Sequence, residues 1–222
     1  MRRTSFVFTA LLLLFCLTAT WPVSAQDKGK GKEKKTYIAS PTIEASGSFN
    51  FGIYNKNDVK AIGITRKLLG SAGLFLGCDF KMPHGILMLQ YGFLISNNNF
   101  IYGDYGKRLV FNSLALDMPF VVDYALRLSN NYSLSFSGGY VTKNIFKYDL
   151  GFVEGHKPIN AFGLYGAIGF CYHASPNFTL RVEPFFEYFW MTPDYYGQLD
   201  YMAPAIIGLR MALKYNILRL AQ

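Results

Sequence analysis

Residues 113 to 127 alternate between apolar side chains and polar or small ones. The apolar positions are Leu114, Leu116, Met118, Phe120, Val122, Tyr124 and Leu126. The positions between them include Ser113, Ala115, Asp117, Asp123 and Arg127. Because successive strand side chains point to opposite faces, this alternation predicts a strand with one apolar and one partly charged face. The usual strand has about 5–6 residues, whereas a tilted strand needs roughly 9–11 to cross a bilayer. The length therefore favours a transmembrane strand.

The same alternation can be traced seven more times along the chain. The eight predicted strands span residues 43–54, 68–82, 86–96, 113–127, 132–146, 161–173, 178–190 and 204–217. Short connections rich in Pro, Asn or Gly alternate with long ones over 55–66, 97–107, 147–160 and 191–203. Short turns at one rim and long loops at the other are typical of outer-membrane barrels, whose short turns face the periplasm. We therefore predict an all-β fold, an eight-stranded antiparallel up-and-down transmembrane β-barrel.

A secreted β-sandwich is the alternative for such a pattern. Its polar faces would meet water and carry many Lys, Glu, Thr and Gln side chains. Here the polar face is mostly Gly, Ala and Ser, which suit the narrow interior of an eight-stranded barrel. Charged residues make up 16% of the chain and aromatic residues 17%, whereas a typical charged share is near 25%. Composition therefore favours the barrel.

The N-terminus predicts secretion. Arg2 and Arg3 precede an apolar run over 6–17, and Val23-Ser24-Ala25 resembles a cleavage site, so residues 1–25 are interpreted as a signal peptide. An uncleaved anchor is the alternative. Residues 26–42 form a predicted Lys/Gly-rich periplasmic tail and linker, with five lysines against two acids between 27 and 35. Such a tail is either solvated and disordered or in contact with anionic lipid or cell-wall polymer. The barrel follows over 43–217, with a short extension over 218–222.

Cysteines and prolines add local expectations. Cys16 would leave with the signal peptide, and Cys78 and Cys171 are predicted to face opposite sides of the wall, so no disulfide is expected. Pro119 and Pro184 fall inside predicted strands, where a missing backbone donor favours a bulge or bend.

Charged residues on the inner face predict a plugged lumen. The predicted network comprises Asp79, Lys81, Asp117, Asp123, Arg127, Arg181, Glu183, Glu187, Arg210 and Lys214. A hairpin centred near Gly197 would set Glu183 opposite Ala212, with Arg210 and Lys214 as diagonal neighbours. A buried charge without a partner costs several kcal/mol. Opposite signs at similar depth therefore predict an interlocked ionic plug with negligible conductance.

The strand over 113–126 carries a family resemblance. Its sequence Ser-Leu-Ala-Leu-Asp-Met-Pro-Phe-Val-Val-Asp-Tyr-Ala-Leu resembles the Tyr-Leu-Glu-Ile-Pro-Leu-Leu-Leu-Lys-Tyr strand of the PorT-like outer-membrane β-barrel family, with Pro119 in the matching place. Residues 137–140 and 162–169 are similar, more loosely, to that family's Gly-rich fifth and sixth strands. The resemblance implies an eight-stranded barrel of the OmpA and OmpX size class in a Gram-negative outer membrane. Family members differ in function, so it implies location more firmly than activity. One departure is the C-terminus, where Tyr215 would have to serve as the terminal aromatic signal.

No constellation of residues predicts an enzyme, a metal site or a cofactor. His84, His156 and His173 have no catalytic or metal-ligand partner at a recognised spacing. His173 with Ser175 is the one candidate pair for a lipid-modifying enzyme, and it falls at the predicted periplasmic end. Acids balance the basic residues of the barrel, so nucleic-acid binding is not expected, and no small-molecule substrate is evident.

The leading hypothesis is a non-enzymatic integral outer-membrane protein that acts through its outer loops, with lipid and an envelope protein or surface glycan as partners. The aromatic contact candidates are Phe100, Tyr102, Tyr105, Phe152, Tyr195, Tyr196 and Tyr201. Aromatic residues beside a membrane are also interface anchors. The alternative is an accessory subunit of a secretion or envelope complex, implied by the PorT-like resemblance and using the basic tail. A small passive pore is a third hypothesis.

Overall fold

The computed structural model describes residues 39–53, 68–104, 107–149, 154–155, 159–191 and 205–218. The predicted signal peptide and most of the predicted outer loops lie outside these residues. The strands are β1 Ala39–Ile53, β2 Leu68–Met82, β3 Gly85–Asp104, β4 Lys107–Arg127, β5 Tyr132–Asp149, β6 Glu154–Gly155, β7 Ile159–His173, β8 Phe178–Met191 and β9 Ala205–Asn216. Among the described residues, no helix has the length and apolarity that crossing a membrane requires.

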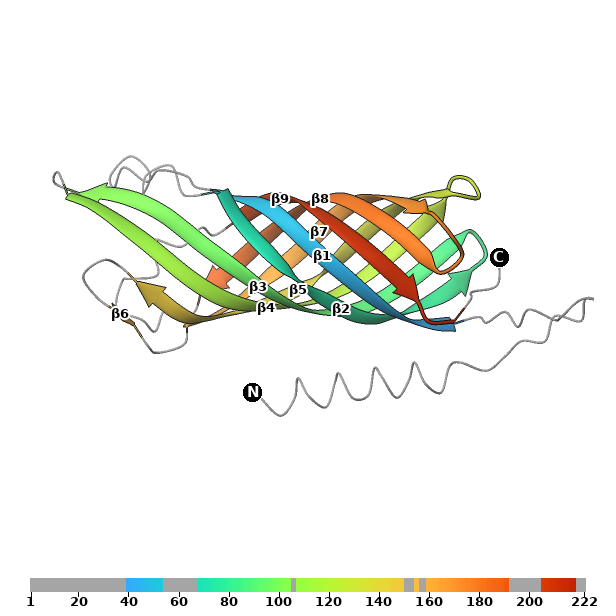
Figure 1. Ribbon diagram of the computed structural model, residues 1–222, viewed down its shortest axis with the longest axis horizontal. Helices are drawn as coiled ribbons and strands as arrows, with labels where there is room; N and C mark the ends of the chain where they lie inside the picture. Colours follow the sequence, from blue (N-terminus) through green and yellow to red (C-terminus); the bar gives the residue numbers. More distant parts are fainter. Residues whose placement is uncertain are drawn as a thin grey trace, which may run out of the picture.

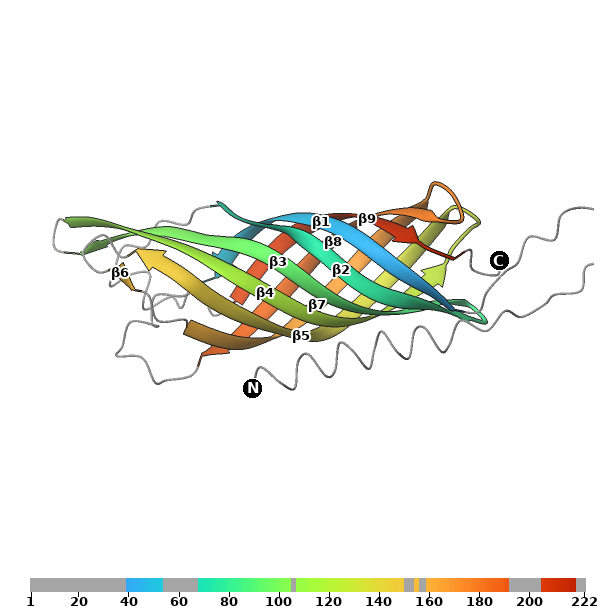
Figure 2. The same cartoon turned by 60° about the horizontal axis from the view of Figure 1, so that its bottom comes forward.

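Eight of these strands close into one antiparallel barrel. Hydrogen-bonded neighbours follow the order β4-β3-β2-β1-β9-β8-β7-β5, and a β4–β5 ladder closes the ring. The strand β6 has two residues, which pair with the last two residues of β5. Figures 1 and 2 show the strands winding around the barrel at a tilt, with the three short turns and the end of β9 at one rim. The predicted fold is confirmed.

The largest differences between predicted and observed strand bounds lie at the start of β1 and in the β3–β4 hairpin. β1 begins at Ala39, which pairs with Phe80, so the barrel starts four residues before the predicted boundary. The predicted loop over 97–107 is wrong, because β3 and β4 stay paired from Gly85↔Leu126 to Asp104↔Lys107. This hairpin extends beyond its neighbours in Figure 1. Asparagine has a weak strand preference, but cross-strand pairing with residues 107–112 outweighs it at Asn97, Asn98 and Asn99.

The prolines interrupt ladders without shifting register. The β3–β4 ladder breaks between Tyr91↔Phe120 and Leu94↔Asp117, with the same register on both sides of Pro119. The β7–β8 ladder breaks in the same way opposite Pro184. No bulge lies at these prolines, and the alternative expectation of a bend stays a prediction. The one register shift on β4 lies between Leu114 and Ala115, opposite the extra residue Phe146 on β5.

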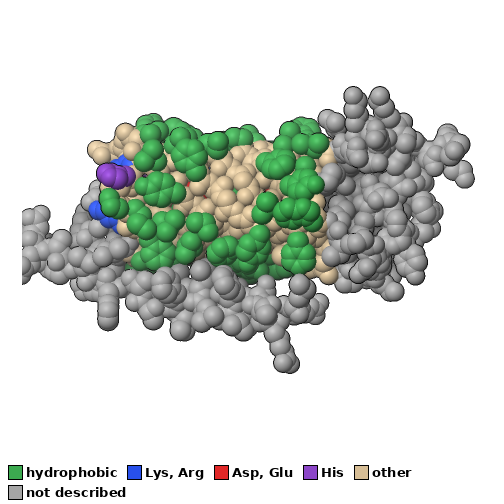
Figure 3. All heavy atoms as spheres, turned by 180° about the vertical axis from the view of Figure 1, so that it is seen from behind, with side chains coloured by type: hydrophobic (Ala, Val, Ile, Leu, Met, Phe, Trp, Pro, Cys, Tyr) green, Lys and Arg blue, Asp and Glu red, His purple; other side chains and the backbone are tan. Residues whose placement is uncertain are grey.

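Apolar side chains cover the outer wall of the barrel. Exposed examples on β7 to β9 are Leu164, Ile168, Phe170, Leu180, Phe186, Trp190, Leu209 and Met211. Figure 3 shows hydrophobic side chains spread over one face of the wall, with Lys, Arg and His side chains gathered at one end. Polar and charged residues are buried inside. This arrangement inverts that of a water-soluble domain.

No disulfide joins Cys78 and Cys171, the two cysteines of the described chain. Cys171 faces the lumen, whereas Cys78 lies on the other side of the wall in a small buried cluster with Ala39 and Phe80. The two thiols are therefore kept apart because their side chains point to opposite faces of the wall, as the alternation on β2 and β7 predicted.

Candidate functional site

Arg181 is the centre of a buried ionic layer in the lumen. We use this name for Glu44, Gln90, Asp123, Tyr165, Arg181, Glu183 and Arg210. The Arg181 guanidinium on β8 lies 2.6 Å from Glu44 Oε1 and also forms an ion pair with Asp123, and its Nε lies 3.4 Å from Glu183 Oε2. All four side chains are almost fully buried. One cation therefore joins carboxylates from β1, β4 and β8 across the barrel.

Arg210 and neutral polar groups complete the ionic layer. Arg210 on β9 forms an ion pair with Glu183, and its guanidinium lies over the Phe75 ring at 4.5 Å. Tyr165 Oη donates a hydrogen bond to Glu183 Oε1 at 2.7 Å. Gln90 Nε2 donates to Glu44 Oε2, and Gln90 Oε1 accepts from Arg181, both at 3.1 Å. Charge-assisted bonds of this kind are roughly twice as strong as neutral ones.

Small residues leave the space that this layer fills. A Cβ atom at Gly169 would clash with Ser135 Oγ and lie 3.2 Å from Glu183 Oε2. The missing side chain at Gly169 therefore leaves room for the Glu183 side chain. Small residues at some inward positions are expected in a barrel of eight strands, because side chains fill its narrow interior.

Two further ion pairs lie on either side of the ionic layer. Towards the short turns, Lys214 Nζ lies 2.5 Å from Asp79 Oδ2, which also accepts a bond of 2.9 Å from Asn216 Nδ2. On the other side, Lys143 Nζ lies 3.5 Å from Asp117 Oδ2 and 4.7 Å from the centre of the Phe189 ring. Charged side chains are thus paired at three levels of the lumen.

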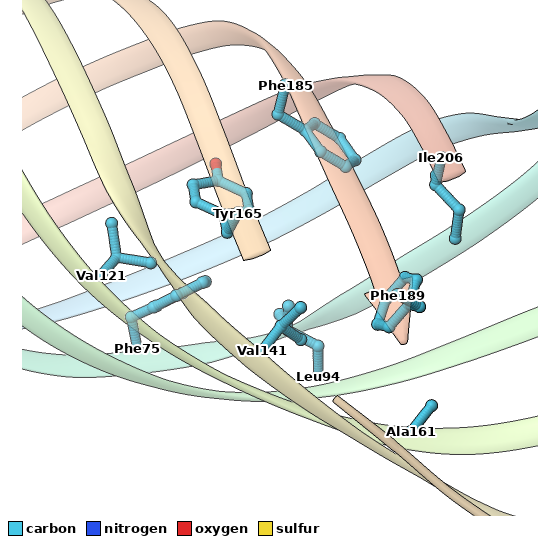
Figure 4. Packing of buried hydrophobic residues seen from close by; sticks show 9 residues of the cluster. All are labelled: Phe75, Leu94, Val121, Val141, Ala161, Tyr165, Phe185, Phe189 and Ile206. Carbon is cyan, nitrogen blue, oxygen red and sulfur yellow. The ribbon is translucent and has the colours of Figure 1, made fainter. Parts of the chain in front are cut away.

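An apolar layer fills the lumen on the side of the ionic layer away from the short turns. Its members are Phe75, Leu94, Val121, Val141, Ala161, Tyr165, Phe185, Phe189 and Ile206. Figure 4 shows these side chains converging from opposite walls. A Cβ at Gly92 would lie 2.6 Å from the Phe75 ring and 2.8 Å from Pro119, so the packing here is tight. Ionic and apolar layers together fill the middle of the barrel.

The structure buries most of the predicted lumen charges. Those buried inside the barrel are Asp79, Asp117, Asp123, Arg181, Glu183, Glu187, Arg210 and Lys214. Lys81 is half-buried near the short-turn rim. Arg127 is exposed there and donates to Ser129 O and Asn130 Oδ1, so its predicted place in the buried network is wrong. Position explains this, because Arg127 is the last residue of β4 and a nearby turn supplies acceptors.

Two charged members of the lumen were missing from the predicted set. Glu44 and Lys143 are both buried and paired. Each lies at an inward position of its strand's alternation, which was the signal that could have identified it. The predicted pairing of Glu183 with Ala212 is also wrong, because β8 and β9 are offset by two residues and Glu183 lies directly opposite Arg210.

The outer-loop aromatic candidates are mostly outside the described residues. Tyr105, Phe152, Tyr195, Tyr196 and Tyr201 lie there. The remaining two occupy the far end of β3, where Phe100 pairs with Phe111 and Tyr102 with Leu109 through the backbone. Their predicted role in contact remains a prediction.

His173 contacts two hydroxyl groups but not Ser175. Its Nε2 lies 2.9 Å from Ser133 Oγ, and its Nδ1 lies 2.9 Å from Thr179 Oγ1. Ser175 Oγ instead accepts bonds from the backbone amides of Asn177 and Phe178. The candidate pair is therefore not assembled. In the described ranges, no three His, Cys, Asp or Glu side chains are grouped so as to hold a metal ion.

Solved structures similar to this chain are small barrels. Ail of Yersinia pestis, in complex with sucrose octasulfate, is 12% identical, with a TM-score of 0.46 over 80% of this chain and 96% of that one. Neisserial surface protein A is 11% identical, with a TM-score of 0.49 over 81% and 99%. The outer membrane protein OprG of Pseudomonas aeruginosa is 11% identical, with a TM-score of 0.46 over 82% and 95%. Neither a protein-family model nor a curated protein sequence matches the chain.

Replacing Tyr165 with phenylalanine tests the ionic layer. A hydrogen bond to a charged group contributes about 1.5–3 kcal/mol, and the hydroxyl is a donor to buried Glu183. We expect Tyr165→Phe to lower the free energy of unfolding by that amount in a urea titration of the folded barrel in detergent. Tyr188→Phe, on the exposed outer wall, should change it by less than about 0.5 kcal/mol. Equal changes in both variants would contradict the assigned role of the Tyr165 hydroxyl.

Proposed function

We propose that this chain is a non-enzymatic integral protein of a Gram-negative outer membrane, with a closed lumen and outer loops that contact a partner or surface component. The observation that carries the proposal is the apolar outer wall around a charged interior. Soluble monomers rarely expose a contiguous apolar patch larger than a few hundred Å². Here exposed Leu, Ile, Phe and Tyr side chains lie on strands all around the ring. Lipid is the environment in which such a wall is stable, and closed barrels leave no unpaired strand edge there.

The outer membrane is favoured by topology together with the predicted signal peptide. Spanning strands with short turns on one side and long connections on the other are typical of barrels inserted from the periplasm. β1 starts beside the β2–β3 turn, since Ala39 pairs with Phe80, and β9 ends beside the β7–β8 turn. Both ends of the barrel chain therefore lie at the short-turn rim, which would face the periplasm.

The filled lumen supports a role in contact rather than conduction. The ionic layer and the apolar layer both cross the barrel, so an ion would have to displace paired charges and then pass packed aromatic rings. The aromatic outer loops supply large contact area at low entropic cost, which suits recognition of a protein or glycan. His173 bound to two hydroxyls supports the non-enzymatic interpretation.

A second candidate is an accessory subunit of a secretion or envelope complex, as the PorT-like resemblance implies. The observation that favours it is the place where the chain enters the barrel. Because β1 begins at the short-turn rim, the basic tail joins the barrel on the proposed periplasmic side. A pull-down from envelope extracts distinguishes the candidates. Partners retained only when residues 26–35 are present would favour the accessory subunit, whereas partners lost on shortening 192–203 would favour the outer loops.

Cell fractionation combined with gel migration tests the membrane assignment. We expect the protein in the outer-membrane fraction, and we expect unheated samples to migrate differently from boiled ones because a closed barrel resists detergent. Barrel closure by eight hydrogen-bonded ladders is the physical reason for this resistance. A soluble periplasmic protein without a mobility shift would overturn the proposal.

Conductance is expected to be negligible. Purified barrel added to a planar lipid bilayer should give no current steps above background, because both lumen layers lie in the path. A porin inserted in the same bilayer provides the positive control. Regular current steps from this barrel would contradict the closed lumen and favour the passive pore.

A further inference from the structure

A polar recess opens at the short-turn rim, at the opposite end from the long connections. Its volume is about 970 Å³, near the upper limit of the roughly 300–1,000 Å³ typical of ligand sites. The three short turns form its mouth, and the first inward residues of the strands form its walls. The side chains of Met88 and Lys214, which are in contact at 2.8 Å, lie between this recess and the ionic layer. The recess is therefore closed at its inner end and is not the entrance of a channel.

Cationic groups outnumber acids around this recess. Lys81 from β2, Arg127 from β4 and Lys214 from β9 line it, whereas Asp79 is the one acid among its described lining residues. Asp79 already accepts bonds from Lys214 and Asn216. Within the described part of the chain, neither Lys81 nor Arg127 forms an ion pair with a carboxylate. Two positive charges are thus left available, and Figure 3 shows the Lys, Arg and His side chains at this end.

Histidine and hydroxyl groups add donors to the same walls. His84 lies in the β2–β3 turn, and His173 is fixed between Ser133 and Thr179. Apolar residues also line the recess, and they include Met82, Pro83, Ile86, Leu128 and Pro176. A lining that mixes cations, hydroxyls and apolar surface suits a ligand with carboxylates and apolar side chains. An inorganic anion would fill only a small part of such a volume.

The direction of the opening favours a ligand from the aqueous side over a lipid. Arg127 pairs across the ladder with Ser133 and Lys81 with Ile86, at positions whose side chains alternate into the lumen. A ligand must therefore enter along the barrel axis from the aqueous side, whereas a lipid headgroup approaches from the outer wall. We propose that this recess binds an extended acidic segment of a partner protein in the compartment that the short turns face. This site is separate from the outer loops and goes beyond the contact role proposed for them.

Peptide binding to the purified, detergent-solubilised barrel tests the proposal. The probe is a short labelled peptide of alternating Glu and Leu, followed by fluorescence anisotropy, and a Lys and Leu peptide of equal length is the comparison. Removing two charge-assisted contacts at about 1.4 kcal/mol or more each corresponds to a loss of affinity of roughly a hundredfold. We expect that loss for the Lys81→Gln, Arg127→Gln double variant. The control, Lys107→Gln with Arg108→Gln, removes the same charge from the opposite end of β4 and should leave affinity within about twofold.

Every outcome of the peptide-binding experiment either supports or overturns the proposal. Preferential binding of the acidic peptide that depends on Lys81 and Arg127 supports the proposal, as does restored binding in a Lys81→Arg, Arg127→Lys variant. Equal binding of acidic and basic peptides, or equal loss in the control variant, would overturn it. Full displacement of the peptide by an equal concentration of pyrophosphate would also overturn it, since the recess would then be a small-anion site. Gel migration of unheated samples verifies that each variant is folded, and Arg127→Gln alone replaces the double variant if the latter is not.

Discussion

Replacing Arg181 with methionine is expected to lower the free energy of unfolding of the barrel by about 3–5 kcal/mol. Arg181 lies between three buried carboxylates, those of Glu44, Asp123 and Glu183. Methionine keeps much of the side-chain volume but removes the charge. Glu183 retains Arg210, whereas Glu44 and Asp123 lose Arg181, the one cation with which either forms an ion pair among the described residues. Breaking a buried pair from one side is costly because it leaves an uncompensated charge.

The measurement is a urea titration of the barrel in detergent, with the fraction of the fast-migrating folded form read from unheated gels. Arg127→Met provides a matched control, since Arg127 is also an inward-position arginine but is exposed at the rim. Its bonds to Ser129 and Asn130 are solvent-accessible, so we expect a change below about 1 kcal/mol. Equal losses in the two arginine variants would contradict the central position assigned to Arg181.

A compensating variant separates charge from packing. Glu44→Gln and Asp123→Asn, combined with Arg181→Met, remove the unpaired carboxylates together with the cation. Replacing a buried ion cluster by neutral groups of similar volume is often close to neutral in stability. We therefore expect the triple variant to recover most of the stability lost by Arg181→Met. If it does not recover, the loss arises from packing around residue 181 rather than from charge.

The alternation of single residues was sufficient to predict the architecture. The strand over 68–82 was predicted with its observed bounds, and the inward and outward positions of the eight strands follow the predicted alternation. The period of two is a local property that each strand carries in its own sequence. The closed barrel then follows because an apolar outer face and an even number of strands leave few other arrangements.

Register and the contents of the lumen are less accessible from sequence. The offset of β8 against β9 depends on the conformation of the connection over 192–204, so Glu183 was set two residues away from its true position opposite Arg210. Val121 and Phe185 stand at inward positions of the alternation, but their neighbours in sequence are also apolar, so nothing in the pattern singles them out as members of an apolar layer in the lumen. The sequence therefore predicted paired charges inside the lumen, although not all of their partners, whereas it did not predict the apolar layer.

Replacing Ile168 with arginine is expected to lower the free energy of unfolding in lipid vesicles by about 2–4 kcal/mol, the cost of a cation near the middle of the apolar belt of a membrane barrel. Ile168 lies on the outer wall of β7, 54% exposed, between the outward residues Leu164 and Tyr172 and opposite Phe136 of β5. In a bilayer its side chain would contact acyl chains, and an arginine there would have to reach the interface or draw water inwards.

Leu128→Arg is the matched control for Ile168→Arg. Leu128 is 59% exposed and directly follows the last residue of β4, at the short-turn rim. There an arginine reaches water and headgroups, so the cost should be about 0–1 kcal/mol. The two positions are similarly open in the isolated barrel, but Leu128 lies at the rim, where it also lines the recess. A large loss of unfolding free energy for Ile168→Arg, together with a small one for Leu128→Arg, would show that lipid surrounds the wall at residue 168. Equally small losses in both variants would contradict this.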